Sequence, residues 1–346
     1  MSLRSPAGYI FPGYDPLRVP NAPTIGAASV ASTTSVSITF TAPSNVGGGA
    51  ITGYVATARR TSDGTTIGAS GSSSPITITG LTADVVYTVT VVAVNAFGPS
   101  ASSAASNSVF PGIVGQQAYT TAGTYSWVTP AGVNSVSVVL VGAGSGGGGP
   151  GNAGNSTGFG VTALGGVGGT PGVTQSTYGS GGDAGFIGGA AGADSSGQGR
   201  SGGGGAAGYA GNGGTGGAFD GGAGAAGSGG GGGGGNSQNV SGGGVGILGQ
   251  GANGAANGGG GSGGANGSAG SGAAGGAYGG GQAPVVAQQF AGGGGCLAYK
   301  NNIAVTPGSS YSITVGAPRG TGGVGAVRII WPGTLRSFPS TNTGDL

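Results

Sequence analysis

The chain has 346 residues, of which 94 are glycine, and only 5% of the residues are charged, giving a net charge of +2. This weak positive charge excludes the electrostatic footprint expected of a nucleic-acid-binding protein. Histidine and glutamate are absent and the seven aspartates are scattered. Imidazole acid–base chemistry and paired-carboxylate hydrolysis are therefore excluded, and we predict no enzyme, no cofactor and no metal site.

The cysteine content and the apolar runs bear on where in or outside the cell the protein is found. Cys296 is the single cysteine, so a disulfide framework is impossible and we interpret it as a small buried side chain. No apolar run approaches the roughly 20 residues that span a bilayer, and the first 20 residues lack the continuous apolar core of a signal peptide. We therefore expect neither membrane insertion nor export by the general secretory route.

Residues 1–21 are rich in proline and aromatic residues and include the stretch YIFPGYDPLRVP. Their apolar pattern is too short to fold alone. They are either a solvated tail or an attachment segment that orders on a partner protein, because several large apolar side chains would otherwise face water. The predicted attachment residues are Tyr9, Ile10, Phe11, Tyr14 and Leu17.

Residues 22–112 alternate apolar and small polar residues over short stretches punctuated by Gly, Pro, Asn and Asp, which predicts an antiparallel β-sandwich. Here the sequence resembles a fibronectin type III domain. Leu81, followed six residues later by Tyr87, has the spacing of a tyrosine corner, and Phe40 stands where that family usually has a tryptophan. The stretch VAVNAFGPS resembles the family's strand F and the turn after it. These are structural residues, and the resemblance implies a spacer.

The rest of the chain, residues 113–346, reads as a β module interrupted by glycine. Strand patterns occupy residues 113–141 and return at residues 296–332, while residues 142–295 are glycine-rich and residues 333–346 form a C-terminal tail. Because strands stand on both sides, we expect the glycine segment to be held at both ends. The predicted fold class is mostly β, with essentially no α-helix.

Within the glycine segment, glycines recur every three residues, for example from Gly202 to Gly217. Period three is the repeat of the polyproline II helix, and the run would form a rod of roughly 56 Å at about 3.1 Å per residue. Such helices have no internal hydrogen bonds, so they need neighbouring copies as partners, with glycine at the contacting edges. The register breaks at Phe219–Asp220 and again between Asn236 and Val240.

A disordered linker is the alternative for this segment, but such linkers usually carry serine and charge and few large side chains. Only four charged residues lie between Gly142 and Gly295, together with several aromatic residues. We therefore predict an ordered bundle of polyglycine II helices held by the β module.

The stretches that flank the glycine segment carry a second resemblance. TYSWVTPAGVNSVSVVLVGAGSGGGG and LAYKNNIAVTPGSSYSITVGA look like the beginning and end of glycine-rich domains in phage tail fibres. GAVRIIWPGTLRSFPSTNTGDL resembles the C-terminal ending of such proteins in cyanophages and other marine phages. Adhesins of this type stack polyglycine II helices and bind host receptors with their distal loops, so the resemblance implies a role and location in the virion.

Three functions remain open from the sequence. The first is a tail-fibre or tip adhesin attached to other virion proteins by its N-terminal segment and recognising a host glycan or outer-membrane protein. The second is a structural or decoration protein, or a self-assembling fibre subunit, without receptor binding; the third is a secreted cellular adhesin. A homo-oligomer is possible in each case. Predicted receptor contacts for the first are Tyr178, Phe219, Asp220, Asn236, Gln238, Asn239 and Tyr278.

Overall fold

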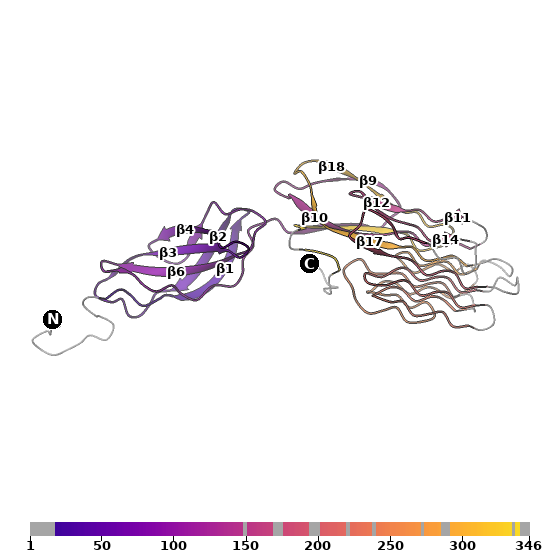
Figure 1. Cartoon of the computed structure of the whole chain (residues 1–346), viewed down its shortest axis with the longest axis horizontal. Coiled ribbons are helices and arrows are strands. Elements are labelled where there is room, and N and C mark those ends of the chain that lie inside the picture. Colours follow the sequence, from indigo (N-terminus) through magenta and orange to yellow (C-terminus); the bar gives the residue numbers. More distant parts are fainter. Residues whose placement is uncertain are drawn as a thin grey trace, which may run out of the picture. The chain divides into compact units, whose positions relative to one another are not determined.

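The computed structural model describes two compact units, formed by residues 1–113 and 114–346 (Figure 1). The described residues are 18–147, 151–168, 176–193, 201–218, 222–236, 240–270, 273–284, 291–333 and 336–339. Within these ranges every regular element is a β-strand and none is a helix, so the predicted mostly-β class is confirmed. The five attachment residues predicted between Tyr9 and Leu17 lie outside the described part of the chain.

The first unit is a sandwich of two antiparallel sheets. Strand β6 alternates buried and half-buried residues along its whole length, as expected of a strand that covers a core with one face. One sheet has the order β1 (Thr24–Ser32), β2 (Ser35–Thr41), β5 (Ile76–Ile78). The other has the order β4 (Thr66–Gly71), β3 (Ile51–Arg60), β6 (Tyr87–Asn95), β7 (Gly98–Pro99).

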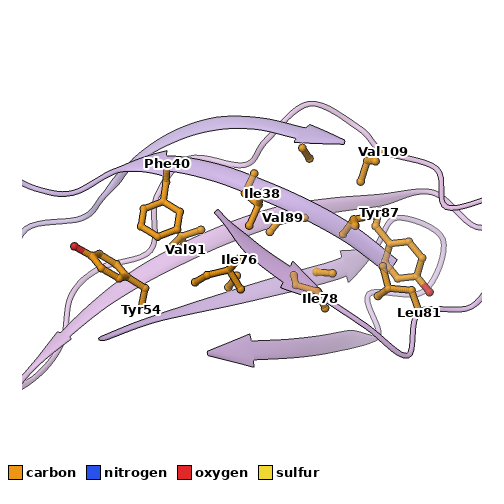
Figure 2. Packing of buried hydrophobic residues seen from close by; sticks show 14 of the residues in the cluster. Ile38, Phe40, Tyr54, Ile76, Ile78, Leu81, Tyr87, Val89, Val91 and Val109 are labelled. Atoms are coloured by element: carbon orange, nitrogen blue, oxygen red, sulfur yellow. The ribbon is translucent and has the colours of Figure 1, made fainter. Parts of the chain in front are cut away.

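Side chains from both sheets meet in one core, shown in Figure 2. Phe40 is buried and packs against Tyr54 with ring centroids 4.6 Å apart. Its phenyl ring therefore occupies the core at the position where we expect the tryptophan of a fibronectin type III domain. Leu81 and Tyr87 are also buried, and the Tyr87 hydroxyl accepts a hydrogen bond from the Thr82 N–H at 3.1 Å. The predicted tyrosine corner is therefore present.

The last segment of this unit, residues 100–109, pairs with β6 in an unusual way. Ser103 donates its N–H to the Val91 carbonyl, and its Oγ accepts the Val91 N–H at 2.9 Å, so a side chain replaces one backbone acceptor. Ser100 and Ser106 make the same two bonds with Ala93 and Val89. A segment with a three-residue repeat is thus joined to alternate residues of a strand.

Replacing Ser103 with alanine should leave the Val91 N–H buried without its acceptor. The expected cost is about 1–3 kcal/mol, or a fall in the melting temperature of the first unit by roughly 5–15 °C. Ser102→Ala is the matched control, because Ser102 is exposed, and should change stability by less than about 0.5 kcal/mol. Calorimetry of the full chain measures both variants, and equal melting temperatures would refute the role given to the Ser103 hydroxyl.

The second unit contains two five-stranded antiparallel sheets. Strand β10 (Ser135–Val141) is buried throughout and lies at the centre of one sheet, between β17 (Leu297–Ala304) and β19 (Ala326–Trp331). Strands that precede and follow the glycine-rich segment therefore pair directly. This sheet is completed by β16 (Ala184–Phe186) beyond β17 and β8 (Gly115–Tyr119) beyond β19.

The second sheet uses residues that the sequence assigned to the glycine bundle. Its order is β15 (Gly179–Ser180), β13 (Val161–Ala163), β12 (Ser156–Gly158), β18 (Ser310–Val315), β9 (Gly123–Val128). A separate pair joins β11 (Gly151–Asn152) and β14 (Val167–Gly168). Part of residues 142–295 is thus β-sheet, because the stretch STGFGVTA has the valine and threonine content of a hairpin.

Aromatic rings join the two sheets of this unit. Trp127 of β9 lies 5.7 Å from Trp331 of β19 between ring centroids, and Phe159 stacks on Tyr311 at 5.0 Å. Phe159 occupies the tight turn between β12 and β13 with φ of 54°, a conformation that is strained for a bulky residue. Contact with Trp127 at 5.6 Å and with Tyr311 offsets this strain.

The remaining glycine-rich residues form a hydrogen-bonded array of extended segments, which we call the glycine array, beside β17 (Figure 1). Its central segment is 201–208, which is buried throughout. The expected rod from Gly202 to Gly217 is wrong: the chain reverses at Tyr209, and segment 211–217 returns antiparallel to 201–208. The bonds that define this hairpin run from the N–H of Gly202, Gly205 and Gly208 to the carbonyls of Gly217, Gly214 and Gly211, at 2.9, 2.8 and 2.8 Å.

Successive amides of the central segment point to three different neighbours. Gly202 and Gly205 donate to 211–217, whereas Gly203 and Ala206 donate to Val240 and Gly243. Gly204 and Ala207 donate to Gly292 and Gly295, and carbonyls of the same segment accept from 189–192, 232–235 and Gly281. A β-strand has only two hydrogen-bonded neighbours, so this pattern, with every third amide directed to the same neighbour, is not that of a sheet.

Candidate functional site

One end of the glycine array is defined by three hydrogen-bonded pairs of residues. Hydrogen bonds join Gly192 to Gly202, Gly217 to Gly235, and Gly292 to Gln282. These residues therefore lie together, and we call this region the break end. Phe219, Asp220, Gln238 and Asn239 lie outside the described residues, but Ala218, Gly222, Asn236 and Val240, which flank them, are at or next to this end.

Two asparagines with exposed or half-buried side chains lie at or next to the break end. Asn236, one of the predicted receptor contacts, is half-buried. Asn257 is exposed, has φ of 64°, and accepts the Gly224 N–H on Oδ1 at 3.2 Å. Asparagine tolerates this left-handed conformation. Sequence reasoning missed Asn257, although it interrupts a run of small residues just before a new glycine register begins at Gly258.

The two tyrosines predicted as receptor contacts lie elsewhere. Tyr278 is half-buried and exchanges backbone hydrogen bonds with Val245, and its ring packs against the buried core of the second unit. Tyr178 is half-buried, and its carbonyl accepts from Leu164 while its ring lies over Gly185 of β16. The structure therefore does not bring Tyr178 and Tyr278 together with Asn236.

The opposite end of the array, which we call the turn end, contains the reversal at Tyr209 and is fastened by the C-terminal residues. Phe338 stacks on Tyr209 with ring centroids 5.9 Å apart, and Asn301 of β17 makes two hydrogen bonds with the Phe338 backbone, at 2.6 and 2.7 Å. Burial raises the pKa of the Tyr209 hydroxyl well above its usual range. Within the segment predicted as a tail, Phe338 is thus a buried part of the core of the second unit.

A buried arginine joins three parts of the second unit at the turn end. Arg328 of β19 is only 1% exposed. Its Nε donates to Gln116 Oε1 of β8 at 2.9 Å, and its Nη1 donates to the carbonyls of Ile247 and Leu248 at 3.1 and 2.7 Å. A guanidinium can serve several acceptors at once. Arg328 therefore ties the array to two strands of the β module.

Arg18, the first described residue, is hydrogen-bonded to residues of the first unit. The Arg18 carbonyl accepts from the Gly48 N–H at 2.8 Å and from Asn95 Nδ2 at 3.1 Å. Two apolar side chains next to it are exposed: Val19 is 40% exposed and Phe97 is 47% exposed. An exposed aromatic at this position leaves apolar surface beside the point where residues 1–17 join the unit.

The described residues include few side chains that could act as nucleophiles or metal ligands. Cys296 is buried, as predicted, and burial raises the pKa of its thiol to about 12, so the thiol stays protonated at neutral pH. Over the same residues, no three His, Cys, Asp or Glu side chains gather as metal ligands. Nor does that part of the chain include a helix of the length and apolar character needed to cross a membrane.

Comparison with known proteins identifies the first unit. Residues 21–109 match the family of the fibronectin type III domain, so the resemblance read from the sequence is confirmed for that region. No curated protein matches the chain.

Similar solved structures each cover about a quarter of the chain. Domains A168–A170 of titin are 28% identical over 28% of this chain, with a TM-score of 0.26. The FN5 domain of Drosophila Lar is 25% identical over 25% of this chain and 91% of its own, with a TM-score of 0.22. Titin module A71 from human cardiac muscle is 26% identical over 27% of this chain and 90% of its own, with a TM-score of 0.22. The chain spans 33% of the length of the titin A168–A170 structure.

Proposed function

We propose that this chain is a non-enzymatic phage virion protein, a tail-fibre or tip adhesin that recognises the host cell surface. The fibronectin type III domain is a β-sandwich module of the adhesion or structural kind. In this proposal, the N-terminal segment, residues 1–21, attaches the chain to other virion proteins, and the break end of the glycine array contacts a host glycan or outer-membrane protein.

The observation that carries the proposal is the hydrogen bonding of segment 201–208. Its amides address three neighbours in turn, with a three-residue repeat, and its carbonyls accept from three more segments. A polyglycine II bundle has this three-fold geometry, so we assign the array to that class. The pattern agrees with the resemblance of the flanking stretches to phage fibre domains, and it gives a rigid support for the polar residues at the break end.

A structural or decoration role in the virion is the second candidate. It is favoured by the exposed Val19 and Phe97 beside the N-terminal segment, because apolar surface at an attachment point suits a repeated contact with a neighbouring subunit. Electron microscopy of the particle separates the two roles. A regular lattice on the head or tail tube would support decoration, and a few copies at a fibre end would support adhesion.

Binding of the fluorescently labelled full chain to a panel of cyanobacterial and other marine bacterial strains tests adhesion. We expect saturable binding to some strains, and replacement of Phe219–Asp220 and Gln238–Asn239 by Gly–Ser pairs should weaken it by at least about tenfold. The matched control is Asn134→Ala, an exposed asparagine of the β module, which should leave binding unchanged. Equal binding by the variants and the parent chain would overturn the assignment of contacts to the break end.

A further inference from the structure

A cavity of about 530 Å³ opens on the second unit beside strands β11 and β14. Strand β14 adjoins the break end, because Gly168 forms a bridge with Gly292. The described receptor-contact candidates, Tyr178, Asn236 and Tyr278, are not among the residues that line this cavity. Its described lining residues are Asn152, Ala153, Gly154, Asn155, Leu164, Gly165, Val167, Ser176 and Thr177.

Two of the polar lining residues sit on a fixed backbone. Asn152 pairs with Val167 in the β11–β14 ladder. Asn155 accepts the Gly165 N–H on Oδ1 at 2.9 Å, which orients its side-chain amide and leaves the Nδ2 donors for a bound molecule. Both asparagines are exposed to solvent, so their amide groups are accessible without any movement of the strands.

Two other lining residues, Leu164 and Thr177, are tied to Cys296, which directly precedes β17. The Leu164 carbonyl accepts the Cys296 N–H at 3.0 Å, and the Thr177 carbonyl accepts from the Cys296 Sγ at 3.7 Å. Ser176 and Thr177 are exposed and bring two hydroxyl groups to the rim. The site is an open pocket whose lining backbone is held by these hydrogen bonds, which lowers the ordering cost of binding.

The chemistry of the lining restricts the ligand. Amides and hydroxyls supply both donors and acceptors, while Ala153, Leu164 and Val167 supply aliphatic surface. Among the described lining residues none is charged and none is aromatic, so the lining itself supplies no counter-charge for an ionised ligand and no ring to stack on a nucleobase. A molecule with many neutral hydroxyls and an apolar C–H face fits this lining.

We infer that this cavity binds a neutral hexose unit of a cell-surface glycan. The inference rests on the proposed adhesin function and adds to it a site and a sugar class. The volume lies within the roughly 300–1,000 Å³ of small-molecule sites and admits one or two sugar rings. Arg319 contacts Gly151 just outside the lining, so a charged comparison ligand is part of the test.

Ligand-detected NMR titration of the full chain with methyl glucoside, methyl galactoside and methyl mannoside tests the site. At least one should bind in the millimolar range, and glucuronic acid and glucosamine, the charged counterparts of glucose, should bind more weakly. Asn152→Ala and Asn155→Asp should each weaken binding by about fivefold to tenfold, the loss expected for one hydrogen bond. Asn155→Asp keeps the acceptor for Gly165, replaces the amide donor and adds a negative charge, whereas Asn134→Ala should bind as the parent chain does.

Unchanged affinity in Asn152→Ala and Asn155→Asp would overturn the site, and tighter binding of glucuronic acid would overturn the neutral class. If no hexoside binds at concentrations up to about 20 mM, both the site and the neutral sugar class are overturned. Attachment of the labelled chain to bacterial cells is scored separately. Cell binding that survives in these variants would leave the adhesin proposal standing without this cavity, whereas loss of all cell binding by the parent chain would count against the adhesin itself.

Discussion

Replacing Gly205 with alanine should destabilise the second unit by at least about 3 kcal/mol, one of the largest effects expected in this chain. A Cβ at Gly205 would overlap the Gly232 carbonyl and lie 2.8 Å from the Gly233 oxygen. Neither backbone can retreat, because Gly205 donates to Gly214 and accepts from Gly189, both at 2.8 Å. Urea unfolding followed by tryptophan fluorescence measures the effect, since both tryptophans, Trp127 and Trp331, belong to this unit.

Gly263→Ala is the matched control for this substitution. A Cβ at Gly263 would meet no atom within 4 Å, so the left-handed φ of 78° is the one obstacle to a side chain there. The expected cost is therefore about 1 kcal/mol, which reflects backbone conformation alone. If Gly205→Ala and Gly263→Ala unfold at the same urea concentration, close packing of the array around Gly205 is disproved.

Arg328→Met should lower the free energy of unfolding of the second unit by about 2–4 kcal/mol. Methionine fills much of the volume, but it leaves the Gln116 side chain and the carbonyls of Ile247 and Leu248 without the guanidinium donors. Arg328→Lys keeps the charge on a compact ammonium that cannot reproduce the planar fork, so an intermediate loss is expected. The same fluorescence-detected urea titration measures both variants.

Lys300→Met provides the comparison for Arg328. Lys300 lies on β17 of the same sheet but is half-buried, and loss of its charge should change stability by less than about 0.5 kcal/mol. A stability of Arg328→Met equal to that of the parent chain would mean that the buried guanidinium contributes nothing to holding the array against the β module.

The first unit was largely predictable because its determinants are local. Alternation in β3 and β6, and the spacing from Leu81 to Tyr87, lie within single stretches of sequence and follow directly from strand geometry. The serine pairing of residues 100–109 was not predicted. Its three-residue repeat carries small polar residues that read equally well as a loop, and only contact with β6 gives Ser103 its role.

The reversal at Tyr209 shows what a glycine repeat cannot reveal. Gly208 and Gly211 are three residues apart in the sequence and also directly hydrogen-bonded across the turn, so the repeat continues unbroken through a hairpin. A rod and a hairpin therefore have the same periodicity. The distinguishing signal is Tyr209, whose side chain is fully buried and cannot occupy the tightly packed interior of a straight glycine run.

The candidate site was predictable only in part, for a related reason. The register breaks marked the chain segments beside Ala218 and Asn236 that meet at the break end, because loss of the repeat signals a turn. Tyr178 and Tyr278 are predicted receptor contacts, but in the structure both pack against neighbouring elements. Partners distant in sequence, such as those of Arg328, leave no local pattern.

Order in the glycine array is tested most directly by amide hydrogen exchange in residues 202–208. Every amide in this range donates to a carbonyl, and the segment is buried, so these amides should exchange as slowly as those of β10 at the centre of the sheet. Exchange at the rate of an unstructured glycine-rich chain, while β10 remains protected, would show that the segment is a linker and would contradict the array.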